Sequence, residues 1–264
     1  MKQTFKFFAF LLAVTLLAGC KDEPDLTENV TKHFDKEFAL LLEERGYIPN
    51  AEKITPADVK DITYLDVSGS YEQRGNLTSL AGIEYFSALD TLNCYFNQLT
   101  TLDVSNNTAL TNLDCSGNQL TTLDVSNNTA LTYLACISNQ LTALDVSKNT
   151  MLDYLRCGIN QLTTLDVSKN TKLTILDCYF NQLTALDISG CTALDHLECR
   201  GNQLTALDVS KNKALIGLNC YDNPGNGTIF PITAWFDNNS IPSGFTTGGW
   251  DFNGNQIKIE YIKK

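Results

Sequence analysis

Residues 89–109 read LDTLNCYFNQLTTLDVSNNTA, and the first half of this 21-residue unit returns six more times before residue 224. A cysteine marks the same place in every unit, and these cysteines are Cys94, Cys115, Cys136, Cys157, Cys178, Cys199 and Cys220. An asparagine follows each of them by three residues, at Asn97, Asn118, Asn139, Asn160, Asn181, Asn202 and Asn223. Self-similarity at a fixed period of this size is the signature of a solenoid, in which each unit forms one coil.

The segment Leu92-Asn93-Cys94 alternates apolar and polar residues, which predicts a short strand with Leu92 and Cys94 pointing inward. Asn97 then predicts a turn, because its amide side chain can pair with backbone groups that a turn leaves unsatisfied. Stacked units would therefore carry a ladder of asparagines. The second half of the unit, Leu-Asp-Val-Ser-x-Asn, looks like a weaker copy of the first and could also contain an extended segment.

The unit resembles the leucine-rich repeat, Leu-x-x-Leu-x-Leu-x-x-Asn/Cys-x-Leu, with cysteine in the third apolar position. The variant unit at residues 77–94 is one residue longer and is similar to the internalin type. The resemblance implies an α/β repeat solenoid, a right-handed coil with a parallel β-sheet on its concave face. We expect repeats of 21–22 residues over 65–224. The closer consensus match favours the Leu-x-Cys half as the main sheet.

In-register parallel stacking would place the seven repeat cysteines about 4.8 Å apart inside a leucine and valine core. They are expected to act there as small apolar groups. Zinc is disfavoured because each coil offers one ligand and no histidine shares the inward face. Disulfides are disfavoured because the usual Cβ separation in a disulfide is about 3.8 Å. Cys191 differs, since it occupies the second-half turn position and predicts a lone thiol near the convex side.

The first 19 residues predict a bacterial lipoprotein signal peptide. Two lysines precede an apolar run that is too short to span a bilayer, and Leu17-Ala18-Gly19-Cys20 follows it. This ending resembles a lipobox, which implies cleavage before Cys20, lipidation of its sulfur and a tether over 20–27. Lys21-Asp22-Glu23 resembles the surface-export tag of Bacteroidota lipoproteins. We expect an outer-membrane lipoprotein exposed at the cell surface, with a periplasm-facing location as the second possibility.

A solenoid needs covers for its apolar ends. Residues 28–64 predict a helical N-terminal cap: one helix over 28–45, and a second that begins at Thr55-Pro56. Residues 225–264 predict a C-terminal β cap, with a strand at 257–261. The aromatic residues of this last segment either seal the final coil or form a glycan-binding module.

Composition and motifs also argue against several classes of function. A net charge of −11 argues against nucleic-acid binding, which needs clustered lysine and arginine. No phosphate loop or nucleophile elbow is present, and His196 and Cys199 point to opposite faces, so we predict no enzyme activity and no cofactor. A column of aspartates offers a minor calcium hypothesis; hydrogen bonding to the following serines is the plainer interpretation. The column contains Asp103, Asp124, Asp145, Asp166, Asp187 and Asp208.

The outward positions of the Leu-x-Cys strands vary between repeats and are rich in Tyr, Phe, Ile and Arg, the composition of binding hot spots. We therefore predict protein binding, of an adhesion or adaptor kind, through the variable concave face. The partner would be a protein on a host or bacterial surface. The alternative is a glycan ligand held by the tyrosines and the C-terminal tryptophans. The predicted contact residues are Tyr95, Phe96, Tyr133, Tyr154, Arg156, Tyr179, Phe180, His196, Arg200 and Tyr221.

Overall fold

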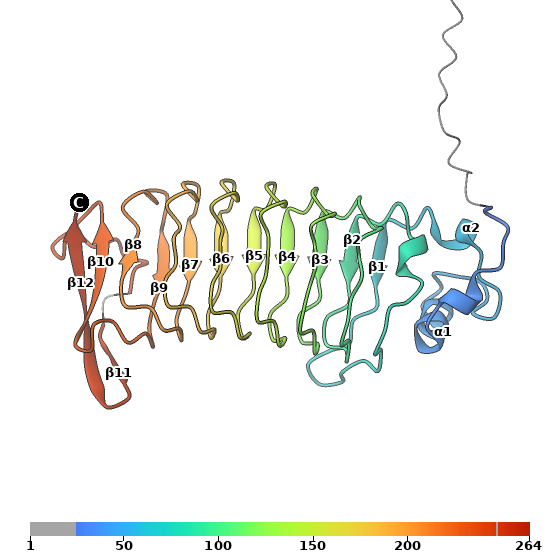
Figure 1. Ribbon diagram of the computed structural model, residues 1–264, viewed down its shortest axis with the longest axis horizontal. Coiled ribbons are helices and arrows are strands. Elements are labelled where there is room, and N and C mark those ends of the chain that lie inside the picture. Colours follow the sequence, from blue (N-terminus) through green and yellow to red (C-terminus); the bar gives the residue numbers. More distant parts are fainter. Residues whose placement is uncertain (1–24, 247) are drawn as a thin grey trace, which may run out of the picture.

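The computed structural model describes residues 25–246 and 248–264 (Figure 1). The expected signal peptide, the lipidation site Cys20 and the Lys21-Asp22-Glu23 tag lie outside the described residues. Within the described part, no helix has the length and apolar character needed to cross a membrane.

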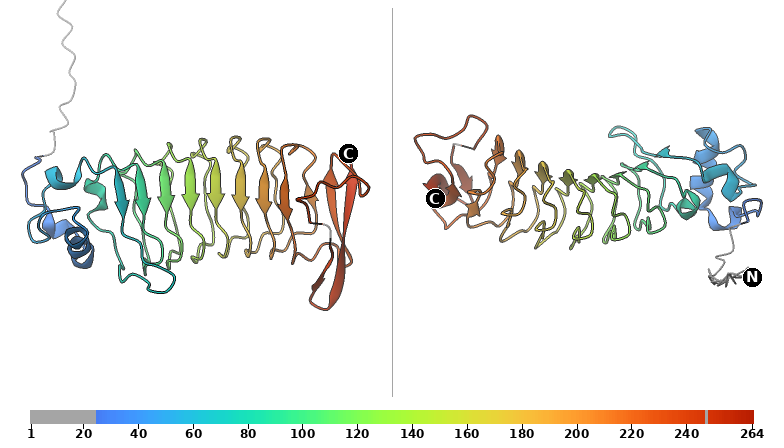
Figure 2. Two further views of the ribbon diagram at one scale, coloured as in Figure 1. Left: turned by 180° about the vertical axis from the view of Figure 1, so that it is seen from behind. Right: turned by 90° about the horizontal axis from the view of Figure 1, so that it is seen from above.

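The described chain is an elongated solenoid with one parallel sheet of eight strands, which follow one another in chain order apart from β8. The strands are β1 (Tyr64–Asp66), β2 (Thr91–Asn93), β3 (Asn112–Asp114), β4 (Tyr133–Ala135), β5 (Tyr154–Arg156), β6 (Ile175–Asp177), β7 (His196–Glu198) and β9 (Gly217–Asn219). Leucine pairs with leucine at every step, as in Leu92 with Leu113. Figure 2 shows the sheet on the inner side of the curve. The Leu-x-Cys half therefore forms the main sheet, as the repeat pattern predicts.

The core consists of stacked leucine, valine and cysteine columns. All seven repeat cysteines are buried, and the eight cysteines of the described chain are free thiols. Burial raises the pKa of Cys157 to about 12, so this thiol stays protonated at neutral pH. The cysteines act as small apolar groups of the core, as expected.

The first asparagine column also matches the prediction. The side-chain amide of Asn118 donates to the carbonyls of Cys94 and Cys115, at 3.0 and 2.9 Å, and its Oδ1 accepts from the amide of Leu99 at 3.0 Å. Each asparagine thus binds its own coil and the preceding one. These bonds satisfy backbone groups that burial would otherwise leave unpaired.

A second asparagine column runs along the convex side of the core. Asn128, for example, donates to the carbonyls of Val104 and Asn107, both at 2.9 Å. Cys191 occupies the corresponding place in its coil, where it is buried and its Sγ lies 3.5 Å from the carbonyl of Val167. The exceptional cysteine therefore replaces an asparagine of this column and keeps one of its two contacts.

Helical segments cover the first coil. They are a short 3₁₀ helix η1 (Thr31–His33), α1 (Lys36–Glu44) and α2 (Pro56–Val59). A second 3₁₀ helix, η2 (Ile83–Tyr85), lies within the variant repeat unit. The α1 helix is shorter than the expected span of 28–45. Phe34 is extended, and the Asp35 carboxylate caps the helix by accepting from the amide of Phe38 at 3.0 Å. Thr55 and a proline start α2, as predicted.

A second sheet closes the other end, in the order β11 (Trp250–Phe252), β12 (Asn255–Lys263), β10 (Ile229–Ala234) and β8 (Leu207–Asp208). β8 belongs to a repeat and pairs with β10 in parallel, so this sheet continues from the convex side of the solenoid. Trp250 is 7% exposed, and its indole nitrogen donates to the carbonyl of Asn223 at 2.8 Å. This tryptophan is committed to the contact with the last coil.

Candidate binding surface on the concave sheet

Figure 2 (left) shows the strands of the concave sheet side by side. The residues between and beside the buried leucines of β2–β7 and β9 point outward from this sheet, and most of them are half-buried. The ten predicted contact residues lie in the strands of this sheet or at most three residues after them. One of them, Tyr221, lies edge-on against Trp250 with ring centroids 5.6 Å apart, so the C-terminal sheet partly covers it.

Two Tyr-Phe pairs, four coils apart, are the main aromatic groups of this surface. The rings of Tyr95 and Phe96 meet edge to face with centroids 5.7 Å apart, and those of Tyr179 and Phe180 do so at 5.8 Å. Both phenylalanines have left-handed backbones, with φ of 53° and 49°. The same position has a positive φ in every repeat, at Phe96, Gly117, Ser138, Ile159, Phe180, Gly201 and Asp222.

The second Tyr-Phe pair holds an arginine over both of its rings, whereas at the first pair an arginine contacts the phenylalanine alone. The guanidinium of Arg200 lies over Tyr179 and Phe180, 5.4 and 5.2 Å from the ring centroids. At the other pair, Arg74 lies 5.7 Å from the centroid of Phe96 and donates to the carbonyl of Gly117 at 3.0 Å. Such cation–π contacts stabilise a guanidinium in a fixed position.

Arg74 and its neighbour Tyr71 were missed by the sequence analysis. They come from the segment 69–76, which interrupts the repeat between β1 and Leu77. Tyr71 is 83% exposed, and its ring meets Phe96 at a centroid distance of 6.2 Å. The sequence feature that could have identified them is the presence of a tyrosine and an arginine in a non-repeating insertion next to the first coil.

The centre of the surface carries a tyrosine pair and an ion pair. The rings of Tyr133 and Tyr154 lie 6.1 Å apart, and Nε of Arg156 lies 3.2 Å from Oδ2 of Asp177. Burial raises the pKa of Asp177, and Arg156 opposes that shift. Burial likewise raises the pKa of Tyr133. Tyr133 and Asp177 are therefore partly desolvated, although they lie on the surface of the sheet.

His196 lies outward, with Nδ1 2.7 Å from a carboxylate oxygen of Asp195, whereas Cys199 is fully buried. The two residues of the His-x-x-Cys sequence therefore lie on opposite faces, as predicted. Arg200 and Glu198 form the second ion pair of this surface, with Nε of Arg200 3.5 Å from Oε1 of Glu198.

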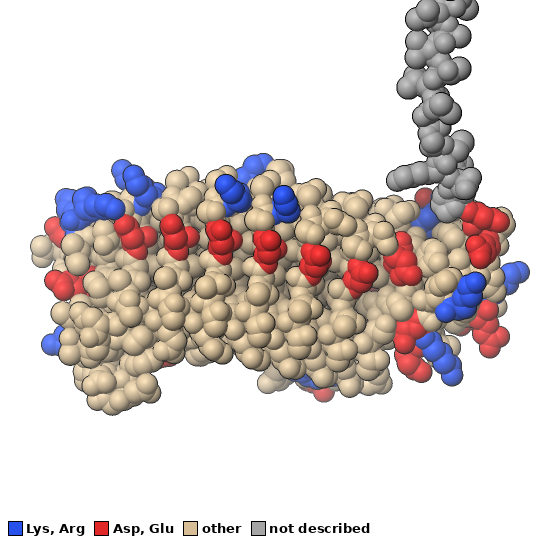
Figure 3. Space-filling view, in the orientation of Figure 1, with Lys and Arg blue, Asp and Glu red and all other residues tan. Residues whose placement is uncertain are grey.

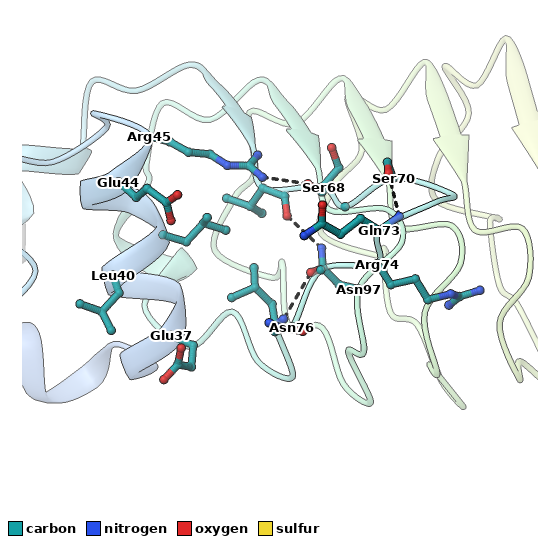
Figure 4. Close-up of a pocket in the computed structure, with 15 residues that line it drawn as sticks. Glu37, Leu40, Glu44, Arg45, Ser68, Ser70, Gln73, Arg74, Asn76 and Asn97 are labelled. Atoms are coloured by element: carbon teal, nitrogen blue, oxygen red, sulfur yellow. Dashed lines mark hydrogen bonds between the residues drawn. The ribbon is translucent and has the colours of Figure 1, made fainter.

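The surface contains a hollow of about 310 Å³ between the first Tyr-Phe pair and the central tyrosines. Its walls are Tyr95, Phe96, Asp114, Ser116, Gly117, Tyr133, Ala135, Ile137, Ser138 and Arg156. A larger cavity of about 550 Å³ lies outside the sheet, between α1 and the 68–77 segment (Figure 4). Its wall residue Arg45 is held by the carbonyls of Asp66 and Ser68, at 2.6 and 2.9 Å.

The aspartate column lies on the opposite, convex face, where Figure 3 shows a row of acidic side chains. Each carboxylate accepts from the backbone amide of the serine two residues later, as in Asp124 with Ser126 at 2.9 Å. These bonds lower the pKa of Asp124. The serine amides thus compensate the stacked charges in the way the sequence analysis favoured.

No family model and no curated protein matches the chain, whereas solved structures do. The functional domain of InlJ from Listeria monocytogenes, which includes a cysteine ladder, is 34% identical over 78% of this chain and 52% of its own, with a TM-score of 0.58. A leucine-rich repeat protein from Leptospira interrogans is 30% identical over 63% of this chain and 45% of its own, with a TM-score of 0.59.

The fold is a leucine-rich repeat solenoid. Internalin C2 from Listeria monocytogenes supports the same fold, with a TM-score of 0.62 at 20% identity over 88% of this chain and 96% of its own. The chain spans about half the length of the first two relatives. The resemblance to internalin-type repeats that the sequence suggests is therefore supported by structure.

Proposed function

We propose that this protein is a non-enzymatic leucine-rich repeat module that binds another protein through its concave sheet, in an adhesion or adaptor role. One observation carries the proposal: the outward strand positions place Tyr, Phe and Arg side chains together on one half-exposed face. Aromatic residues and arginine dominate protein-binding hot spots, because they contribute large contact areas and directed polar contacts.

The order of these side chains strengthens the proposal. Tyr133 packs on Tyr154, Arg156 is held by Asp177, and Arg200 is held between two rings and Glu198. Side chains fixed in this way lose little conformational freedom on binding, so less of the contact energy is cancelled. The proposal needs no cofactor, and calcium at the aspartate column is not part of it.

The test uses the Cys20→Ser chain, which cannot be lipidated, as bait for surface proteins of bacterial and host cells. The variant Tyr133→Ala/Tyr154→Ala removes the central aromatic pair, and Lys148→Ala/Lys169→Ala is the matched change in the convex half of the repeats. Loss of capture with the first variant and retention with the second would support the proposal. Equal capture by both variants, with unchanged melting temperatures, would overturn it.

A glycan array with the same three proteins tests the glycan alternative. The structure removes part of the basis for that alternative, because Trp250 is buried and its indole nitrogen is bonded to the chain. Binding to a glycan that is lost in the tyrosine variant, without any protein captured, would replace the proposed partner class.

We also propose that the module is displayed as a lipoprotein on the outer membrane. The support is the sequence Leu17-Ala18-Gly19-Cys20 and the acidic tag that follows it. Incorporation of labelled palmitate that is lost in Cys20→Ala tests the anchor. Digestion of the protein by protease added to intact cells tests surface exposure, and protection from the protease until the outer membrane is opened would place it in the periplasm.

A further inference from the structure

One column of the concave sheet contains Asp66 of β1 and three carboxylates that lie between the leucine and the cysteine of their repeats. Asp66 is paired with Arg45 at 3.7 Å. Asp177 is paired with Arg156, and Glu198 with Arg200. Asp114, the third, has no lysine or arginine partner among residues 25–246 and 248–264. Its Oδ1 accepts from the amide of Ser116 at 3.0 Å, which is the one hydrogen bond of its carboxylate within this part of the chain.

The site around Asp114 can be compared with an equivalent site four repeats later, around Glu198. Tyr95, Phe96 and Asp114 lie four repeats before Tyr179, Phe180 and Glu198, and each pair of equivalent residues is 84 positions apart. The two sites therefore present the same combination of a tyrosine, a left-handed phenylalanine and a carboxylate on the next coil. Gly117 and Gly201, against which the phenylalanine rings lie, are also equivalent.

The two sites differ in one decisive position. At the second site Arg200 places its guanidinium over both rings and beside Glu198. The equivalent residue at the first site is Ser116, whose side chain is much smaller. The hollow of about 310 Å³ opens at this place, with Ser116, Asp114 and both rings in its walls.

The two arginines nearest the first site are engaged elsewhere. Arg156 reaches the wall of the hollow but is paired with Asp177. Arg74 contacts Phe96, does not line the hollow, and donates to the carbonyl of Gly117. The hollow therefore combines aromatic faces with an unneutralised carboxylate, which is the chemistry that binds a cation.

We propose that this hollow receives a lysine side chain of the partner protein, with its ammonium group at Asp114 and its methylene stem along Tyr95, Phe96 and Tyr133. The inference rests on the proposed function, because it assigns the partner a lysine at the centre of the contact. The apolar wall residues Ala135 and Ile137 fit the stem. The second site shows the same chemistry already satisfied by the chain's own Arg200.

The probe is Nα-acetyl-lysine methylamide, titrated into the Cys20→Ser chain while its NMR spectrum is recorded. Nα-acetyl-norleucine methylamide, which lacks the charge, is the matched neutral probe. We expect weak, saturable binding of the lysine probe with shifts confined to the hollow. The neutral probe should bind about three- to tenfold more weakly, as loss of one cation–π and ion-pair contact predicts.

Three variants sharpen the test. Asp114→Asn removes the charge and keeps the acceptor for Ser116, so it should weaken lysine binding by a similar factor. Ser116→Arg recreates the arrangement of Arg200 and should abolish binding by filling the hollow. Asp103→Asn, on the convex face, is the control: Oδ1 of Asp103 also accepts from the amide of a serine two residues later, at 2.9 Å, and its loss should change nothing.

Equal affinity for the lysine and norleucine probes, or unchanged lysine binding in Asp114→Asn, would overturn the proposal. Absence of lysine binding to the unmodified hollow would do so as well. Failure of this site and failure of the proposed function are separable. If capture of a partner depends on Tyr133 and Tyr154 but is unaffected by Asp114→Asn, only the proposed lysine site is wrong. If capture is also insensitive to the two tyrosines, the proposed binding face is wrong.

Discussion

The ring of Phe180 lies against the backbone of Gly201, one coil further along, so closely that a Cβ atom at Gly201 would lie 2.1 Å from Cδ1 of the ring. Phe96 and Gly117 repeat this relationship at 2.5 Å. In both places the glycine also has a positive φ, 64° at Gly201 and 68° at Gly117. These glycines let a phenylalanine with a left-handed backbone lie on the sheet.

Gly201→Ala should therefore destabilise the protein and displace Phe180. The left-handed backbone costs alanine about 1 kcal/mol, and the ring must also leave the position where it contacts Arg200. Urea unfolding and the ring-current shifts of Tyr179 and Phe180 would measure both effects. Gly46→Ala is the control, because Gly46 has a φ of 76° with no atom near its added Cβ. Identical unfolding curves for the two variants would contradict the packing argument.

Cys157 should resist alkylation in the native protein. Its pKa of about 12, raised by burial, leaves a very small thiolate fraction at pH 8, and the thiolate is the reactive form. We expect iodoacetamide to label Cys157 about a thousandfold more slowly than in urea, given an unperturbed cysteine pKa of about 8.5. Mass spectrometry of the peptide after a short labelling pulse gives the rate. Labelling at the unfolded rate in native buffer would show that this thiol is not buried.

Cys191→Asn should stabilise the solenoid. An asparagine there can donate to the carbonyls of Val167 and Asn170, since Asn149 makes the equivalent bonds to Val125 and Asn128 at 2.9 Å. The sulfur of Cys191 contacts only the first of these carbonyls, at 3.5 Å. The gain should stay below about 1 kcal/mol, the contribution of one additional buried hydrogen bond, because the new Oδ1 would be buried without a partner, as Oδ1 of Asn149 is. Chemical denaturation measures it. Cys191→Ala, which offers neither donor, should move stability in the opposite direction.

Acid should weaken the contact between Asp208 and the C-terminal sheet. Hydrogen bonding from Ser210 and the ammonium of Lys264, 3.0 Å away, lower the pKa of Asp208 to about 2. An unfolded aspartate titrates near pH 3.9. Because the folded pKa is the lower one, Asp208 stabilises the fold above about pH 4, and that contribution is lost as the pH falls towards 2.

The difference in unfolding free energy between the unmodified protein and Asp208→Asn should therefore shrink between pH 4 and pH 2. Lys264→Gln keeps the Ser210 contacts and should reduce the pH dependence without removing it. A difference that stays constant down to pH 2 would show that the carboxylate is not perturbed.

The repeat made most of the fold predictable. Because Leu92, Cys94 and Asn97 recur at one period, their inward positions, their parallel pairing and the amide ladder follow from strand geometry and from the need to satisfy buried backbone groups. The second-half turn predicted an unusual place for Cys191, and the structure adds that this place belongs to a second asparagine column.

Periodicity could not predict contacts that cross between repeating and non-repeating segments. Tyr71 and Arg74 reach Phe96 from an insertion, and their position depends on how that segment returns to Leu77. The expected helix over 28–45 is interrupted because Asp35 forms a better helix start than the preceding residues. The sequence does not distinguish Asp114 from Asp177 and Glu198, because only the side-chain positions show that the latter two are paired with arginines.

Because the concave strands pair in register, the number of strands between two sites determines the distance between them along this face. The two Tyr-Phe sites are separated by four strand intervals, about 19 Å at the usual spacing of parallel strands. Insertion or deletion of one 21-residue unit between them would lengthen or shorten this separation by one strand interval and leave both sites chemically intact. Binding of a ligand that contacts both sites would therefore depend on the number of repeats between them. Unequal recombination that adds or removes whole repeats would change this spacing without changing the residues of either site.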